Sequence, residues 1–315
     1  METKAARLHN YGGPDAIEVE DAEIPEPKAG EVVIKVRDAG VNPVDWKIAE
    51  GYLKDVMPLK FPVTLGTDVA GVVEAVGPGV TEFSRGDQVY GQAGIATGGS
   101  GSFAEFAVAT PKTLARKPTA VDFVKAASLP LAGVSALQAL TEHIDLRAGQ
   151  KILIHGGAGG IGSIAIQIAK HIGAEVATTC SKEDTEFVRD LGADKAIDYK
   201  TQRFEDILSN LDAVYDTVGG ETYERSFKVL KKGGRIVSML ESPRDDLVNQ
   251  YGVEAMFQFT QVTNERLIRL AALVESGAIK THIAKVYPLE DAATALRDLK
   301  EHSPKGKMAI AVGGR

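Results

Sequence analysis

Apolar and polar residues alternate in short runs along the first part of the chain. The clearest runs cover residues 31–37, 69–76, 88–90 and 103–107, and glycine or proline residues separate them. A period of two is typical of strands that bury one face, and the breaks are typical of turns. Residues 1 to about 119 therefore predict a compact, irregular, mostly antiparallel β domain.

After residue 121 the pattern changes, and short apolar runs alternate with longer helical stretches. Strands are predicted at 151–155, 175–179, 195–198, 212–216 and 235–239. Parallel strands need helical crossovers, so this part of the chain predicts an α/β fold with a doubly wound parallel sheet.

The last part of the chain is expected to return to the first domain. A helical stretch near 264–276 precedes a strand at 282–287, a helix at 289–300 and a final strand at 307–312. The predicted segments are therefore 1–121, 122–259 and 260–315. Residues 91–101 have the composition of a mobile loop or a disordered surface turn, and residues 241–262 predict no particular structure.

A glycine-rich turn joins the strand at 151–155 to an amphipathic helix. Gly157, Gly159 and Gly162 have the G-x-G-x-x-G spacing of dinucleotide-binding folds. The first glycine permits the tight turn, the second lets the backbone approach a pyrophosphate, and the third lets helix and strand pack closely. The alternative is an ordinary tight turn, but the position between strand and helix favours cofactor binding.

The start of that helix is the expected phosphate site. Its unpaired N–H groups bind anions, so Gly160 and Ile161 join the three glycines as predicted cofactor contacts. The uncharged run at 152–169 contains too many glycine and polar residues for a membrane span, so no membrane association is expected.

The end of the second strand indicates which cofactor binds. NAD usually requires a carboxylate there, whereas this strand ends in Cys180, Ser181 and Lys182. A hydroxyl and an ammonium suit a 2′-phosphate, so we expect NADPH rather than NADH. Glu183 and Asp184 follow at once and weaken this expectation, although a helix start favours acidic residues in any case.

Composition narrows the remaining possibilities. The 315 residues are 44% hydrophobic and 25% charged, with a net charge of −7, so nothing indicates nucleic-acid binding. The single cysteine excludes an intrachain disulfide and a thiolate-rich metal site, and the six histidines are scattered, so no metal is expected. The N-terminal residues have neither signal-peptide nor transit-peptide character, which favours a cytoplasmic location.

Five motifs occur along the chain: NPVDWK at 42–47, LGTDVAGVVEAVG at 65–77, GDQVYG at 86–91, the glycine turn, and LGADKAIDY at 191–199. With these motifs the whole chain resembles the medium-chain dehydrogenase/reductase superfamily, and most of all its zinc-independent quinone and enone oxidoreductases. The resemblance implies a GroES-like catalytic domain built from both ends of the chain, with a Rossmann NADP-binding domain at 122–259 between them.

The departures from the zinc-dependent branch of this superfamily matter as much as the matches. That branch has a cysteine ligand where residues 42–44 stand, and a Gly-His-Glu motif where residues 66–68 read Gly-Thr-Asp. Its four-cysteine structural zinc lobe is replaced by the glycine-rich loop before Phe103. Ordinary alcohol oxidation is therefore not expected, because no Lewis acid would polarise the alcohol.

Several site residues follow from the resemblance. The position of Lys47 contacts cofactor or substrate in the family, which implies an electrostatic role for it. Asn42 is expected to hydrogen-bond the cofactor ribose or the substrate oxygen, and Tyr52 to donate its phenol to the acceptor oxygen. For both, a packing or turn role is an equal alternative. Val134 is expected at the floor of the cleft.

Other site residues lie at predicted strand ends, where open α/β sheets bind ligands. Tyr199 follows the third strand, and the family uses this tyrosine to cover the adenine or its 2′-phosphate. Residues 216–219, including Val218, and then Met239 and Leu240 are expected to line the nicotinamide side.

The leading hypothesis is an NADPH-dependent oxidoreductase that reduces quinones or α,β-unsaturated carbonyls. A reductase of enoyl thioesters is the nearest alternative, although no basic entrance for coenzyme A is evident. A non-catalytic NADPH-binding sensor or regulator is a third reading, because a cofactor motif does not prove turnover. The family usually pairs through its Rossmann sheet edges, so a homodimer is expected.

Overall fold

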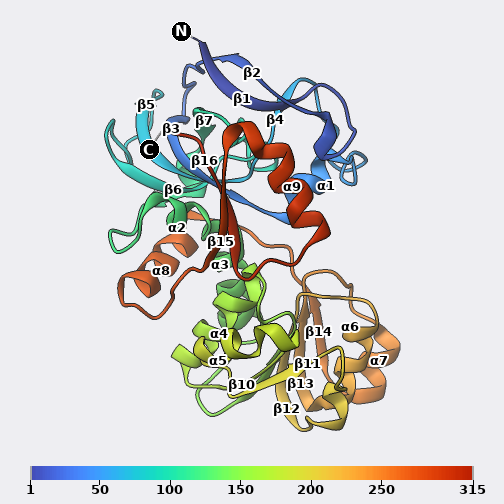
Figure 1. Cartoon of the computed structure of the whole chain (residues 1–315). Coiled ribbons are helices and arrows are strands. Elements are labelled where there is room, and N and C mark those ends of the chain that lie inside the picture. The colour runs from blue at the N-terminus through green and yellow to red at the C-terminus, as the bar shows by residue number, and fades with distance from the viewer. Residues whose placement is uncertain (1, 314–315) are drawn as a thin grey trace. The chain divides into compact units, whose positions relative to one another are not determined.

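The computed structural model describes residues 2–313 and divides them into two compact units (Figure 1). The first unit contains the residues up to Leu131, Val262–Ser276 and the residues from Thr281 onward. The second unit contains Ala132–Gln261 and Gly277–Lys280. None of the helices within residues 2–313 is long and apolar enough to cross a membrane.

The first unit is built on a seven-stranded sheet with the order β15-β16-β3-β5-β6-β8, and β7 also pairs with β3. Its strands are β3 (Val32–Val41), β5 (Asp68–Val76), β6 (Gln88–Gln92), β7 (Phe106–Ala109), β8 (Leu114–Arg116), β15 (Ile283–Pro288) and β16 (Lys307–Ala311). A smaller sheet contains β2 (Ile17–Glu23), β1 (Glu2–Leu8) and β4 (Val63–Thr64). All these pairs are antiparallel except β15 with β16, so the mostly antiparallel prediction is confirmed.

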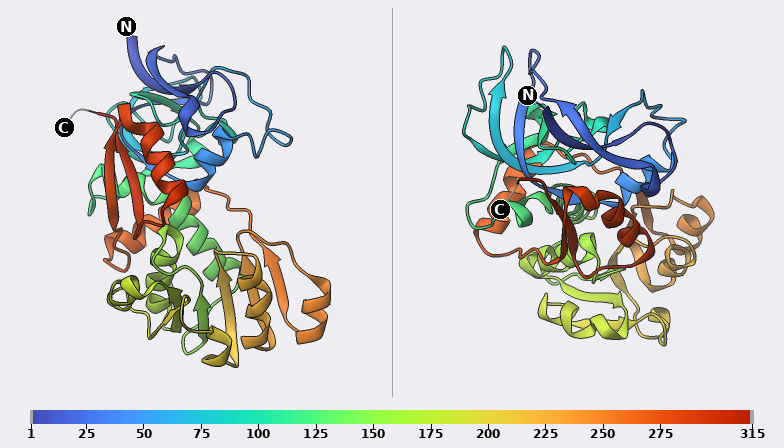
Figure 2. Two further views of the ribbon diagram at one scale, coloured as in Figure 1. Left: turned by 45° about the vertical axis from the view of Figure 1, so that its right-hand side comes forward. Right: turned by 45° about the horizontal axis from the view of Figure 1, so that its top comes forward.

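Four helices belong wholly to the first unit: α1 (Pro43–Ala49), α2 (Phe123–Ala127), α8 (Asn264–Glu275) and α9 (Ala292–Glu301). Helix α9 buries Ala292, Ala295 and Leu296 and packs against α1 and β16. Figure 2 shows β15 and β16 side by side with α9 next to them. The tail therefore completes the sheet begun by β3.

The second unit is a parallel six-stranded sheet with the order β11-β10-β9-β12-β13-β14. The strands are β9 (Lys151–Ile154), β10 (Glu175–Cys180), β11 (Lys195–Asp198), β12 (Leu211–Asp216), β13 (Leu230–Ser238) and β14 (Glu254–Phe257). Helices α4 (Gly160–Ile172) and α5 (Thr185–Asp190) lie on one side of the sheet, and α6 (Glu221–Ser226) and α7 (Asp245–Tyr251) on the other (Figure 1). This is the predicted doubly wound fold.

The sixth strand, β14, was not predicted. It lies in the stretch that showed no pattern, because an exposed edge strand has no regular burial: Glu254, Met256 and Phe257 are all exposed. Its position is decided by pairing with β13 and not by its own hydrophobic periodicity.

The boundaries of the two compact units fall at other residues than the segment bounds expected from the sequence. The first unit extends to Leu131, ten residues beyond the expected boundary at 121, because α2 packs on β3 and β5. A Cβ at Gly40 would lie 2.3 Å from the Ala127 carbonyl oxygen, so this packing is close. Gly277–Lys280 joins the second unit, where the Gln167 side chain bonds both backbone groups of Lys280.

Helix α3 (Pro130–Gln138) continues as a π-helical turn at Ala139–His143, and neither was predicted. The glycine-rich stretch at 91–101 contains a short 3-10 turn at Ile95–Thr97. Two backbone hydrogen bonds hold this stretch at Ala93. The Ala93 N–H donates to the Thr67 carbonyl, and the Ala93 carbonyl accepts from the Gly101 N–H.

Candidate functional site

Two of the three motif glycines in the turn of the second unit have no room for a side chain, and the remaining one does. A Cβ at Gly157 would lie 2.0 Å from Thr178 Oγ1, and a Cβ at Gly162 would lie 2.2 Å from the Gly156 carbonyl oxygen. Gly159 is the N-cap of α4, and a Cβ there would meet only the Gly156 oxygen, at 3.4 Å. Packing therefore requires the outer two glycines, whereas the middle one faces open space beside the helix N-terminus, where Gly160 and Ile161 begin α4.

The ends of β10 and β11 bring the predicted 2′-phosphate residues together. Cys180 pairs with Asp198, so Ser181 and Lys182 lie next to Tyr199, whose N–H donates to the Cys180 carbonyl. The Tyr199 side chain is 61% exposed and accessible to a flat ligand. The acidic neighbours are also present, since Ser181 Oγ donates to Asp184 Oδ2 at 2.8 Å.

The ends of β12 and β13 are held by one buried carboxylate. Asp216 Oδ1 accepts from the Val218 and Gly219 N–H groups, each at 3.0 Å, and Oδ2 accepts from Ser238 Oγ at 2.7 Å. Ser238 Oγ in turn accepts from the Leu240 and Glu241 N–H groups. Residues 216–219 were expected to line the site, but Asp216 is itself completely buried and acts as an anchor.

Three predicted residues lie along this edge in different surroundings. Val218 and Leu240 are about half exposed at 50% and 48%, while Met239 is half-buried and donates its N–H to the Asp216 carbonyl. Exposed apolar side chains at the carboxyl end of a parallel sheet are typical of a ligand surface. Val134, on α3, is fully buried, so its role at the floor of a cleft stays a prediction.

His155, next to the glycine turn, is structural. Burial lowers the pKa of its imidazole to about 4, so the ring is neutral. Its ring nitrogens lie 3.1 Å from Thr179 Oγ1 and 2.9 Å from Ser226 Oγ, and its ring packs edge-on against Phe204.

In the first unit, Lys47 and Tyr52 lie at the end of α1. The Tyr52 N–H donates to the Lys47 carbonyl, and the Tyr52 ring is 66% exposed. Both side chains contact Trp46: the Lys47 ammonium lies 5.7 Å from the indole centroid, and the Tyr52 ring centroid lies 5.9 Å away. The structure thus presents a cation and a phenol from one short segment.

Asn42, the third predicted catalytic residue, is only 2% exposed. Its Nδ2 donates to Asp68 Oδ2 at 3.0 Å, and its Oδ1 accepts from Lys307 Nζ. Its backbone N–H donates to Asp45 Oδ2 at 2.8 Å. The side chain therefore lies inside a buried network, and its contact with ribose or substrate stays a prediction.

That network lies where β3, β5, β6 and β16 meet. Asp68 accepts from Asn42, from Gln92 Nε2 at 3.1 Å and from the Leu131 N–H at 3.0 Å. Asp45 accepts from Thr67 Oγ1 at 2.7 Å. Burial raises the pKa values of both carboxyls, that of Asp45 to about 7.

The network includes residues of the two segments, 42–44 and 66–68, in which the resemblance implies that the zinc-dependent branch has its ligands. Asn42, Thr67 and Asp68 stand there, and each has a side-chain polar atom bonded to a protein neighbour. Within residues 2–313, one group of three side chains has metal-ligand spacing: His9, Glu18 and Glu20. It lies on the surface beside β1 and β2, and Glu20 already pairs with Arg7.

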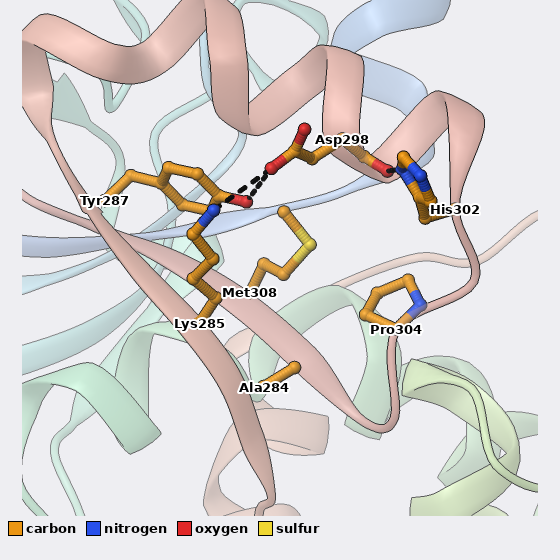
Figure 3. A pocket seen from close by; sticks show the side chains of 7 residues that line it. All are labelled: Ala284, Lys285, Tyr287, Asp298, His302, Pro304 and Met308. Carbon is orange, nitrogen blue, oxygen red and sulfur yellow. Dashed lines mark hydrogen bonds and ion pairs between the residues drawn. The ribbon is translucent and has the colours of Figure 1, made fainter. Parts of the chain in front are cut away.

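A pocket of about 350 Å³ lies elsewhere in the first unit, between β15, β16 and α9 (Figure 3). The residues that line it are Ala284, Lys285, Tyr287, Asp298, His302, Pro304 and Met308. Asp298 Oδ2 accepts from the Tyr287 hydroxyl at 2.5 Å and pairs with Lys285 Nζ at 3.2 Å. None of the predicted site residues lines this pocket.

Two family models match the chain. Residues 28–119 match the alcohol dehydrogenase GroES-like domain, and residues 191–310 match the zinc-binding dehydrogenase domain. The NADPH-dependent alkenal/one oxidoreductase of Arabidopsis thaliana, a chloroplastic protein, is 38% identical over 98% of this chain and 79% of its own length. The chain belongs to the quinone and alkenal/one oxidoreductase family of medium-chain dehydrogenases/reductases.

Solved structures of the family agree. The quinone oxidoreductase from Coxiella burnetii is 34% identical, with a TM-score of 0.90 over 99% of this chain and all of its own. The Escherichia coli quinone oxidoreductase complexed with NADPH is 27% identical, with a TM-score of 0.89 over 98% of this chain and all of its own. The family resemblance and the α/β fold with a GroES-like and a Rossmann part are therefore confirmed, and the protein is an oxidoreductase.

We expect Asp45 to make the free energy of unfolding depend on pH. Its folded pKa of about 7 lies above the ordinary 3.8, so between these values the folded state holds a proton that the unfolded state has lost. The free energy of unfolding should therefore fall as pH rises through this window and level off above it. Asp45→Asn imitates the protonated acid and should weaken that fall.

Urea unfolding of both proteins at about pH 5 and about pH 8 measures the effect. The difference between the two proteins isolates Asp45, because His155 and the other titrating groups are common to both. An equal fall in both proteins would contradict the assignment.

Proposed function

We propose that this protein is an NADPH-dependent, zinc-independent oxidoreductase that reduces quinones or α,β-unsaturated carbonyls by hydride transfer. The observation that carries the proposal is the buried network at Asn42, Thr67 and Asp68. These residues offer neither a thiolate nor an imidazole, and the carboxylate oxygens of Asp68 already accept from protein donors. An acceptor reduced without a Lewis acid must already be electron-poor, as quinones and enones are.

The second unit supplies the cofactor surface. The α4 N-terminus beside Gly159 suits a pyrophosphate, and Ser181 and Lys182 suit a 2′-phosphate. Tyr199 is exposed beside them to cover the adenine. Asp216 holds Val218 and Leu240 in place for the nicotinamide side. When bound, NADPH supplies the hydride.

The first unit supplies the groups that stabilise developing charge. Negative charge forms on the acceptor oxygen, and a preorganised donor there lowers the barrier. Tyr52 is assigned the hydrogen bond to that oxygen, and Lys47 a favourable electrostatic field. Proton delivery needs no dedicated acid, since water can protonate an enolate or a hydroquinone anion.

The alkenal/one relative and the quinone oxidoreductase structures support this reaction over the two alternatives. An enoyl-thioester reductase would need a cationic entrance for coenzyme A, and a regulator would need no catalytic pair at Lys47 and Tyr52. A cytoplasmic location stays a prediction, since the Arabidopsis relative is chloroplastic.

The reaction is tested by NADPH oxidation with a small quinone, a short 2-alkenal and an enoyl thioester offered in parallel. We expect turnover with the quinone or the alkenal that a chelator leaves unchanged. Loss of activity with chelator would refute zinc independence, and tight NADPH binding without turnover of any acceptor would favour the regulator.

Lys182→Ala tests the cofactor preference. Loss of a charge-assisted hydrogen bond to the 2′-phosphate should raise the NADPH dissociation constant about tenfold or more and leave that of NADH unchanged. Lys195→Ala, at the opposite end of the same sheet, is the matched control. Equal weakening of both cofactors, or stronger binding of NADH by the unaltered protein, would refute the preference.

A homodimer through β14 is the second part of the proposal. Strand β14 ends the sheet order, and Met256, Phe257 and Phe259 on and after it are 42%, 44% and 75% exposed. An apolar edge strand is suited to pairing with a second copy of the same edge.

Phe259→Glu should shift the mass measured by light scattering from dimer toward monomer, because it places a carboxylate in the apolar contact. Ile207→Glu, at another exposed apolar residue of the same unit, should leave the dimer intact. A monomeric unaltered protein, or a dimer indifferent to Phe259→Glu, would refute this interface.

A further inference from the structure

Helix α1 depends on tertiary contacts for its stability and position. It has seven residues, and a helix of this length is marginal without tertiary contacts. It nevertheless carries Lys47 and leads directly to Tyr52. Its position must therefore be set by its two ends and its packing.

The N-terminal end of α1 is held by a lysine from the other end of the chain. Lys307 begins β16, which pairs with β3 so that Met308 lies opposite Val41. Lys307 Nζ donates to the Val41 carbonyl at 2.7 Å and to Asn42 Oδ1. Asn42 is the N-cap of α1, so these bonds hold the point at which strand becomes helix.

The Lys307 ammonium is also the counter-charge of the buried network. Lys307 is 5% exposed, and Asp45 and Asp68 are completely buried. Burial lowers the pKa of Lys307, while Asp68 and Asp45 raise it. A neutral side chain at position 307 would leave two oxygens without this donor and Asp68 without its counter-charge, which is costly in a low-dielectric interior.

Asp45, Asp68 and Lys307 all bond to Asn42, at the first turn of α1. The Asn42 N–H donates to Asp45, and the Asn42 amide bridges Lys307 to Asp68. A change at Lys307 therefore reaches Asn42 directly and reaches Lys47 through one turn of α1.

We propose that Lys307 is a positioning residue of the reaction: its bonds to Val41 and Asn42 set the start of α1 and thereby place Lys47 and Tyr52. This inference rests on the proposed function for its catalytic consequence, but the placement of α1 can be measured without turnover. Trp46, the single tryptophan of the chain, lies on α1 between Asn42 and Lys47 and reports on that placement.

The first measurement is Trp46 fluorescence in folded Lys307→Met, with folding checked by circular dichroism. We expect a red-shifted emission and stronger acrylamide quenching than in the unaltered protein. Lys285→Met is the matched control, because Lys285 belongs to the neighbouring strand and forms an exposed pair with Asp298. Lys307→Arg keeps the charge and should stay closer to the unaltered spectrum.

The second measurement is a double-mutant cycle on kcat/KM. Lys307→Met should lower kcat/KM about tenfold or more, mainly through kcat, in the unaltered background. In a Lys47→Ala, Tyr52→Phe background the same change should cost less than about threefold, because its route of action has been removed. Lys285→Met should leave both values unchanged.

The outcomes separate the two proposals. Equal losses of kcat/KM in both backgrounds, or an unchanged Trp46 spectrum in folded Lys307→Met, would overturn the role of Lys307. If Lys307→Met does not fold, Asn42→Ser breaks the same bond from its other side, with the same expectations. Absence of turnover by the unaltered protein would overturn the proposed function, and the fluorescence comparison would still test the placement of α1.

Discussion

Burial of charge is the constraint on which the first unit depends. Asp45, Asp68 and Lys307 lie in the interior, where an unpaired charge is far more costly than in water. Each must therefore meet its partners with good geometry, and those partners come from β3, β5, β6 and β16. The same bonds that satisfy the charges bring together segments from both ends of the chain and set the position of the short helix α1.

The second unit also contains a buried, fully hydrogen-bonded carboxylate, but its partners include no cation. Asp216 is buried at the end of β12 and is satisfied by two backbone N–H groups and the Ser238 hydroxyl. Ser238 then accepts from two N–H groups after β13. In both units a buried carboxylate accepts hydrogen bonds from the backbone of a segment that carries exposed side chains. Asp45 binds the start of α1, and Asp216 binds the turn after β12. Preorganisation of this kind lets a site bind without first ordering its loops.

The elements with strong periodicity were predictable from sequence, and those without it were not. All five predicted strands of the parallel sheet are present, four within one residue of their expected bounds, whereas β13 begins at Leu230 and not at 235. Strand β14 was missed because it is an exposed edge. The first compact unit runs on to Leu131, past the expected boundary at 121, because α2 packs on β3 and β5 and the Leu131 N–H donates to Asp68. These contacts join segments distant in the chain, so no local sequence pattern predicts them.

The sequence by itself determined the fold class, the glycine turn and the residue types at the cofactor and catalytic positions, because these depend on local spacing. Only the tertiary structure decided that Asn42 is buried, that Asp216 is an anchor and that Lys307 belongs to the network. Lys307 and Asn42 are 265 residues apart in the chain, and Lys307 begins a strand where it would ordinarily be read as a solvated charge. A pairing between distant residues leaves no local pattern, because sheet register and burial, which arise only on folding, create it.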